Sequence, residues 1–187
     1  MTYLRASEII PSDESEPLAS RPLVEVTNET DVAVHSQRLE AAVAAALAEI
    51  GDRRAAVSVA VVDDATIHAL NRRFLAHDYA TDVLSFVLED SPQVLEGEII
   101  ASIDAARREA ADAGWPAEDE LLLYVVHGAL HLAGYGDQDA AAVAEMRQAE
   151  AAVLDRLGVV RSPRDARWRA GGEPTSDEPS DEEARAL

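Results

Sequence analysis

The residues best suited to chemistry lie in one short stretch, 127–137, which reads HGALHLAGYGD. Its two histidines, His127 and His131, stand four positions apart, so in a helix both imidazoles would point at the same place. Gly134 suits the left-handed position at which many helices end, and the chain beyond it could turn back and bring Asp137 to that place too. Two imidazoles and a carboxylate form a three-ligand set with an open position, which is typical of a hydrolytic zinc site.

Two other interpretations of the histidine pair must be weighed. Zinc peptidases carry His-Glu-x-x-His on a helix and use the glutamate as general base. The residue after His127 is Gly128, so a peptidase of this kind would lack its base. In the simpler interpretation, both histidines are core residues that bond to their neighbours. The glycine-containing turn and Asp137 favour the metal site over that interpretation.

The histidines lie near the end of a helix that the sequence predicts from about Ala117 to Ala133. Trp115-Pro116 marks its beginning, because proline is favoured at the first position of a helix. Apolar residues lie on most sides of this helix, which predicts a central and buried position: Leu121, Leu122, Val125, Val126, Leu130 and Leu132. A polar pair on a buried helix needs partners, and a metal ion would supply them.

The rest of the chain predicts the elements that surround this helix. Runs rich in β-branched and apolar residues predict strands at 23–27, 57–62, 83–88 and 98–103. Apolar residues at helical spacing predict helices at 36–50, after Asp63 or Asp64, at 104–113 with Asp104 as its cap, and at 139–157. Residues 89–96 are expected to be a connector. The order predicts an α/β (α+β) fold, one domain over about 23–160, with a four-stranded mixed sheet, about five helices and the metal-binding helix in the core.

The strongly negative charge of the chain limits which partners it can bind. The net charge is -20, and between residues 23 and 160 nine arginines stand against 25 acidic residues. A negative electrostatic potential repels the phosphates of nucleic acids. A role on nucleic acid therefore requires a local basic patch or a bound cation. We expect residues 1–22 to be a disordered acidic arm and residues 161–187 a disordered charged tail.

The compartment is also constrained by composition. The chain has no cysteine, which excludes disulfides and thiolate metal sites. Its apolar runs are far shorter than the roughly 20 residues of a membrane span, and the acidic N-terminus does not resemble a signal peptide. We therefore expect a soluble, cytoplasmic protein without a membrane partner.

Three blocks of the chain resemble one known family, in the family's order and spacing. They are HGALHLAGY at 127–135, a Leu-Asn pair at 70–71 followed by TDVLSF at 81–86, and GEIIAS at 97–102. These blocks resemble the YbeY family of bacterial endoribonucleases, the rRNA maturation factors. The resemblance covers about 23–158. It implies a metalloprotein that cleaves single-stranded RNA in rRNA 3'-end maturation and ribosome quality control, with rRNA and ribosomal small-subunit particles as partners and no role on DNA.

The resemblance also implies one Zn²⁺ per chain, with His127 and His131 as two of its ligands. In the best-known members the third ligand is a histidine in Gly-Tyr-Asp-His, whereas Asp137 occupies that position in this chain. A carboxylate is an acceptable zinc ligand, so we expect the site to persist and to tolerate other divalent metals more readily. The alternatives are that Asp137 caps the following helix, or that Asp139 caps it while Asp137 binds the metal.

A second departure from the family concerns Leu75. Many members have an arginine at this position that is linked to RNA cleavage, and leucine does not pair with phosphate. Arg72 and Arg73, on the same helix, are the candidate substrate-binding residues, and Arg72 is nearer in angle to position 75. Either arginine alone could instead be an exposed, solvated side chain.

The catalytic acid or base is left unassigned. Analogy with the family places His77, Asp82 and Ser85 near the site, but each also has a structural interpretation. His77 could be a plain loop residue, Asp82 a hydrogen-bond acceptor in a turn, and Ser85 a position in the sheet.

Two other functions compete with the endoribonuclease. The first is a ribosome-assembly factor that binds pre-ribosomal particles and has weak or no nuclease activity. Leu75 and the charge of -20 motivate it, because basic ribosomal proteins would suit an acidic surface. The second is a metal-dependent hydrolase with a substrate other than RNA.

Overall fold

The computed structural model describes residues 22–48, 50–51 and 53–160. The two expected disordered segments, 1–22 and 161–187, lie outside the described residues except for Pro22. The elements follow one another as β1 (Leu23–Asn28), α1 (Ser36–Ala46), β2 (Arg54–Val62), α2 (Asp64–Leu75), β3 (Val83–Asp90), β4 (Val94–Ser102), α3 (Ile103–Ala113), α4 (Ala117–Leu132) and α5 (Ala140–Arg156).

The four strands form one mixed sheet in the order β1-β2-β4-β3. β1, β2 and β4 run parallel, and β3 pairs antiparallel with β4 at one edge. The connections explain this pattern, because β1 and β2 are joined through a helix, whereas a tight hairpin joins β3 to β4. The predicted four-stranded mixed sheet with five helices is confirmed.

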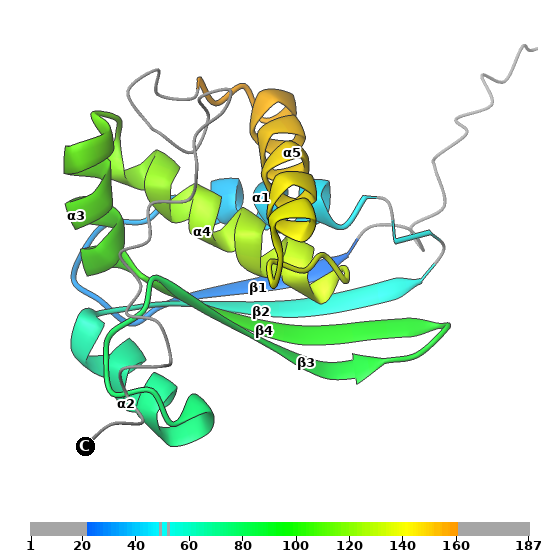
Figure 1. The fold of residues 1–187 in the computed structure, drawn as a ribbon, viewed down its shortest axis with the longest axis horizontal. Coiled ribbons are helices and arrows are strands. Elements are labelled where there is room, and N and C mark those ends of the chain that lie inside the picture. Colours follow the sequence, from blue (N-terminus) through cyan, green and yellow to red (C-terminus); the bar gives the residue numbers. More distant parts are fainter. Residues whose placement is uncertain (1–21, 49, 52, 161–187) are drawn as a thin grey trace, which may run out of the picture.

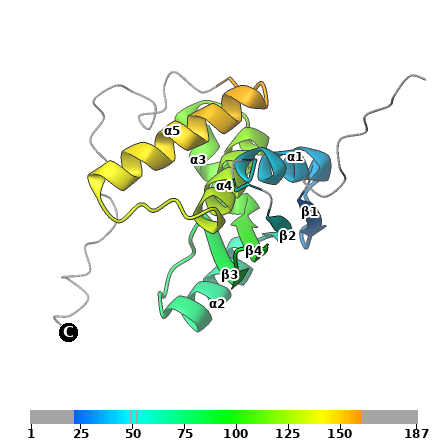
Figure 2. The same ribbon diagram turned by 90° about the vertical axis from the view of Figure 1, so that its right-hand side faces the viewer.

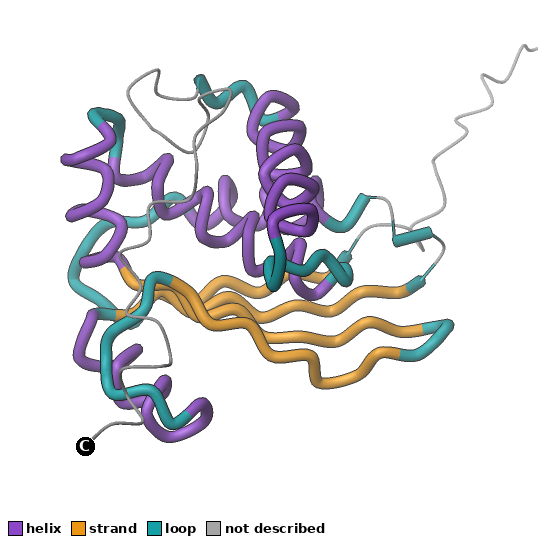
Figure 3. Tube along the Cα trace, in the orientation of Figure 1, coloured by secondary structure: helices purple, strands orange, loops and turns teal. Residues whose placement is uncertain are grey.

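The helices are distributed unequally over the two faces of the sheet. Helices α1, α4 and α5 lie on one face with α3 beside α4, and α2 lies on the other (Figures 1 and 2). Figure 3 shows the strands as a single layer between these two groups of helices. Helix α4 is buried along most of its length, from Glu120 to Leu132, so the predicted central position of the histidine helix is confirmed. Among the described residues, no helix is both long and apolar enough to span a membrane.

Two glycines allow α4 to approach the sheet closely. A Cβ atom on Gly128 would lie 3.0 Å from Cγ2 of Ile99 in β4. A Cβ atom on Gly97, also in β4, would lie 2.6 Å from Cδ1 of Leu132. The missing side chains therefore set the distance between α4 and β4, and with it the depth at which the histidines lie.

Three elements begin or end at residues other than those expected. Residues 89–96 are not a connector, because β3 continues to Asp90 and β4 begins at Val94. The turn between them is closed by a hydrogen bond of 2.9 Å from the Ser91 amide to the Val94 carbonyl. The first helix ends at Ala46 rather than at residue 50, and Leu47 stays buried where the chain turns towards β2.

The start of α3 also differs from the expectation. Ile103 is the first residue of the helix rather than the last of the strand, and Ser102 is the N-cap in place of Asp104. The Ser102 hydroxyl oxygen accepts a hydrogen bond of 3.1 Å from the Ala105 amide. Asp104 instead accepts from the backbone amide of Asp64 at 3.2 Å, which ties α3 to α2.

Candidate metal centre

The turn that follows α4 brings Asp137 back to the histidines. Gly134 adopts the left-handed conformation, with φ of +99°. The Gly134 amide donates to the His131 carbonyl at 3.0 Å, and the Tyr135 amide donates to the Leu130 carbonyl at 3.0 Å. These two bonds form a Schellman motif, which closes the helix and reverses the chain. The predicted role of Gly134 is therefore confirmed.

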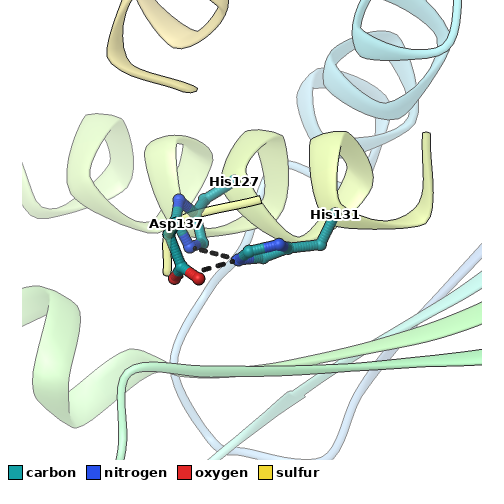
Figure 4. Close-up of side chains that lie close together, drawn as sticks. All are labelled: His127, His131 and Asp137. Atoms are coloured by element: carbon teal, nitrogen blue, oxygen red, sulfur yellow. Dashed lines mark hydrogen bonds and ion pairs between the residues drawn. The ribbon is translucent and has the colours of Figure 1, made fainter. Parts of the chain in front are cut away.

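Three side chains converge beside α4 at the end of this turn. His127 and His131 project from the helix, and Asp137 reaches them from the turn (Figure 4). Each offers one ligand atom, and these three atoms all lie within 4.8 Å of one another. The Nε2 atoms of the two histidines are 2.8 Å apart, and Oδ2 of Asp137 lies 3.5 Å from Nε2 of His131. The group fits the donors that a divalent metal ion requires.

The hydrogen bonds of the two imidazoles determine which nitrogens are free for a ligand. Nδ1 of His127 lies 2.7 Å from a carboxylate oxygen of Glu150, and Nδ1 of His131 lies 2.9 Å from the Tyr135 carbonyl oxygen. Both partners accept hydrogen bonds, so both Nδ1 atoms carry hydrogen. In their neutral forms the two rings then direct their Nε2 lone pairs at each other. That arrangement needs a proton or a cation between the nitrogens.

The charges around His127 favour a cation. Burial of the ring would by itself lower its pKa, but the hydrogen bond to Glu150 and the negative charges of Glu150, Asp82 and Asp137 outweigh it. The pKa of His127 is therefore raised above its ordinary value. The same field attracts a metal ion, which competes with the proton for Nε2.

The helix after the turn is capped by Asp139, not by Asp137. The Asp139 carboxylate accepts hydrogen bonds of 2.9 Å from the amides of Ala141 and Ala142. The cap is thus supplied two residues after Asp137, whose carboxylate is left to face His131. This geometry matches the alternative in which Asp139 caps the helix while Asp137 takes part in the site.

We expect the two aspartates to separate stability from metal binding. Asp139→Ala should lower the free energy of unfolding of the metal-free protein by about 1 kcal/mol, because it removes the N-cap of α5, and should leave zinc affinity nearly unchanged. Asp137→Ala should weaken zinc binding without a comparable loss of stability. Urea unfolding and zinc competition with a chromophoric chelator measure both properties, and the opposite assignment of effects would show that the two roles are exchanged.

The structure places the three residues suggested by family analogy in three different surroundings. Asp82 is exposed and accepts from the Val83 amide at 2.8 Å, as expected of a turn acceptor, yet its charge also acts on His127. Ser85 pairs in register with Ile99, which contacts Gly128, so it lies on the sheet face that α4 covers. The ring of His77 stacks on Tyr79, with centroids 5.4 Å apart, and in the described part of the chain His77 is not one of the grouped candidate ligands.

The two candidate substrate-binding arginines are not part of this cluster. Arg72 and Arg73 lie on α2, on the opposite face of the sheet from α4 (Figure 1). Both are exposed, and within the described residues neither forms an ion pair. The guanidinium of Arg73 lies 5.0 Å from the centroid of the Phe74 ring. Leu75 is also exposed, so no cation occupies that position on the surface.

One residue of the site was missed by the sequence reasoning. Glu150 lies in α5 and is only 6% exposed, yet its carboxylate bonds to His127. A signal for it exists in the sequence, because Met146, Glu150 and Leu154 are spaced four apart on the buried side of the helix. An acid within an apolar stripe needs a partner.

Comparison with known proteins agrees with the three sequence blocks. A family model described as Endoribonuclease YbeY matches residues 25–158. The solution structure of TM1509 from Thermotoga maritima is similar to this chain, with a TM-score of 0.53 and 26% sequence identity, over 72% of this chain and 89% of that one. The family model thus supports the resemblance in sequence, and the solved structure supports the fold.

Individual relatives carry the same name. Endoribonuclease YbeY of Rhodopirellula baltica is 48% identical over 122 residues, which are 64% of this chain and 62% of that protein. Endoribonuclease YbeY of Desulfitobacterium hafniense is 44% identical over 117 residues, which are 57% of this chain and 74% of that protein. Because the family model covers more than half of its length, this chain belongs to the YbeY endoribonuclease family.

Proposed function

We propose that this protein is a zinc-dependent endoribonuclease that cleaves single-stranded RNA in rRNA 3'-end maturation and ribosome quality control. The observation that carries the proposal is the pair of Nε2 atoms of His127 and His131, which lie 2.8 Å apart while both Nδ1 atoms are engaged elsewhere. Asp137 adds a negative oxygen to the same place. Membership of an endoribonuclease family supports RNA as the substrate.

The side chains suit a hydrolytic metal. Two imidazole nitrogens and one carboxylate oxygen are ordinary zinc ligands, and three protein ligands leave a position open for substrate. A bound zinc ion supplies Lewis acidity, which polarises phosphoryl oxygens and makes water nucleophilic at neutral pH. In this proposal His127, His131 and Asp137 hold the ion. The Tyr135 carbonyl keeps the ring of His131 in the orientation that directs its Nε2 at the site.

Arg72 and Arg73 are proposed to bind the RNA backbone. The net charge of -20 repels RNA over most of the surface, so cations without acidic partners carry unusual weight. The loop 76–82 leads from the end of α2 to Val83, which lies beside Gly128 of α4. A single strand that follows this loop would run from the histidine pair to the two arginines.

Removing both arginines tests this path. We expect Arg72→Ala combined with Arg73→Ala to weaken binding of single-stranded RNA and to leave zinc affinity unchanged. The slope of log affinity against log salt concentration should fall by about 1.4, because each phosphate contact to a single strand contributes about 0.7. Fluorescence anisotropy with a labelled oligoribonucleotide at several salt concentrations measures this slope.

The matched control is Arg54→Ala. Arg54 is exposed, forms no ion pair within the described residues, and starts β2 at the end of that strand remote from α2. Its removal should change the salt slope little. Equal losses in the control and in the double variant would mean that the arginines act only through net charge.

The choice of substrate tests the proposed function as a whole. Zinc-loaded protein should cleave single-stranded RNA, and should leave duplex RNA and single-stranded DNA of the same sequence intact. The exposed Leu75 favours one other candidate, an assembly factor with weak or no nuclease activity. Protein that binds zinc and sediments with ribosomal small-subunit particles, but cleaves none of the three substrates, would support that candidate instead.

A further inference from the structure

Glu150 is a buried carboxylate that contacts the histidine pair from another helix. Its Oε1 lies 2.7 Å from Nδ1 of His127, and the side chain is almost completely shielded from solvent. Among the described residues, His127 is the one hydrogen-bond partner of this carboxylate. The side chain of Glu150 therefore connects helix α5 to the candidate metal centre.

Packing alone does not account for an acid at this position. Met146 and Leu154, one turn before and one turn after Glu150, are both buried and apolar. A leucine in place of Glu150 would continue this stripe without the cost of removing a charge from water. The carboxylate is therefore better explained by its bond to His127 than by the contact between α5 and its neighbours.

The bond to Glu150 has a defined effect on the ring. An acceptor at Nδ1 keeps the hydrogen on that atom, leaves the lone pair on Nε2, and fixes the rotation of the ring. Nε2 of His127 then points at Nε2 of His131, 2.8 Å away. Nδ1 of His131 bonds to a neutral group, the Tyr135 carbonyl. Of the two rings, only that of His127 therefore has a negatively charged partner at Nδ1. A carboxylate behind an imidazole also makes the ring a stronger donor to a metal.

We propose that Glu150 is a positioning residue that holds His127 in the metal-binding tautomer and orientation, and thereby sets the affinity of the centre for zinc. This inference rests on the proposed function, because it assumes that His127 is a ligand. Partners of this kind change metal affinity by about 10- to 100-fold when they are removed. Contact between α5 and α4 then becomes a condition for tight metal binding.

Two variants separate orientation from charge. Glu150→Leu fills the apolar stripe and removes the acceptor, and we expect it to weaken zinc binding by about 10- to 100-fold. Glu150→Gln keeps an acceptor oxygen without the charge, and we expect a smaller loss. The matched control is Glu145→Gln, an exposed acid on the same helix, which should bind zinc like the unmutated protein. Competition with a chromophoric chelator gives the affinities.

A second measurement does not depend on metal. Imidazole ¹⁵N chemical shifts of the metal-free proteins report which nitrogen of His127 carries the hydrogen. We expect the Nδ1–H form in the unmutated protein and in Glu150→Gln, and a mixture of tautomers in Glu150→Leu. Should Glu150→Leu fail to fold, Glu150→Gln still tests the proposal, because its zinc affinity must fall below that of the Glu145→Gln control.

The outcomes distinguish this inference from the function on which it rests. Unchanged zinc affinity in both Glu150 variants, together with an unchanged His127 tautomer, would overturn the role of Glu150. If the unmutated protein binds no zinc, the proposed metal centre fails. The ¹⁵N comparison would then still decide whether Glu150 orients His127.

Discussion

Replacement of His131 with alanine is expected to abolish zinc binding and RNA cleavage together. His131 supplies one of the two facing Nε2 atoms and is also the histidine nearest to Asp137, so its loss breaks both contacts of the centre. The Lewis acidity of a metal stabilises the transition state of such a reaction by several kcal/mol. Loss of the metal should therefore lower the rate of cleavage by at least about a thousandfold. Metal content and cleavage of a labelled single strand measure the two effects.

The matched control for this variant is His35→Ala. His35 is an exposed histidine that precedes α1 and lies outside the group of candidate ligands. It should keep one zinc ion per chain and full cleavage. The fold of His131→Ala should also persist, because the side chain of His131 is partly exposed and its loss opens no large cavity. A His131→Ala protein that retains both zinc and cleavage would refute the assignment.

The second large effect is expected from Gly128→Glu, which creates the His-Glu-x-x-His pattern of zinc peptidases. A Cβ atom at this position already lies 3.0 Å from Ile99 and 3.4 Å from Val83. The new carboxylate would be buried between α4 and the sheet without a partner, so overpacking and an unpaired charge act together. We expect a loss of at least about 3 kcal/mol in the free energy of unfolding, measured with urea.

The same added charge on the surface serves as the control. Ala140 is exposed at the first position of α5, where an acid is favourable, so Ala140→Glu should change stability by no more than about 0.5 kcal/mol. If Gly128→Glu is as stable as this control, then Gly128 does not set the approach of α4 to the sheet. Peptidase activity in the unmutated protein would contradict the exclusion of that class.

The three candidate ligands were predictable because they come from one short stretch. Helical spacing places His127 and His131 on one face, and the left-handed tendency of glycine at 134 predicts where the helix ends. These are local rules, and they hold in the structure. The central position of α4 followed from its apolar residues in the same way, since a helix that is apolar on most sides must be covered on most sides.

Features that depend on packing between distant elements were not predictable from such rules. The contact between Glu150 and His127 requires α5 to cross α4, and spacing within either helix does not reveal that crossing. The start of α3 is a similar case, because Ser102 and Asp104 are both good capping residues. The pairing of Ser102 with Val62 extends β4 and leaves Ser102 at the boundary.

The central claim is that His127, His131 and Asp137 hold one metal ion on which RNA cleavage depends. The most direct test is to titrate zinc into metal-free protein and to measure cleavage of a single-stranded RNA at each step. We expect no cleavage without metal, and a rise that saturates at one zinc ion per chain. Full cleavage by the metal-free protein in the presence of a chelator would contradict the claim.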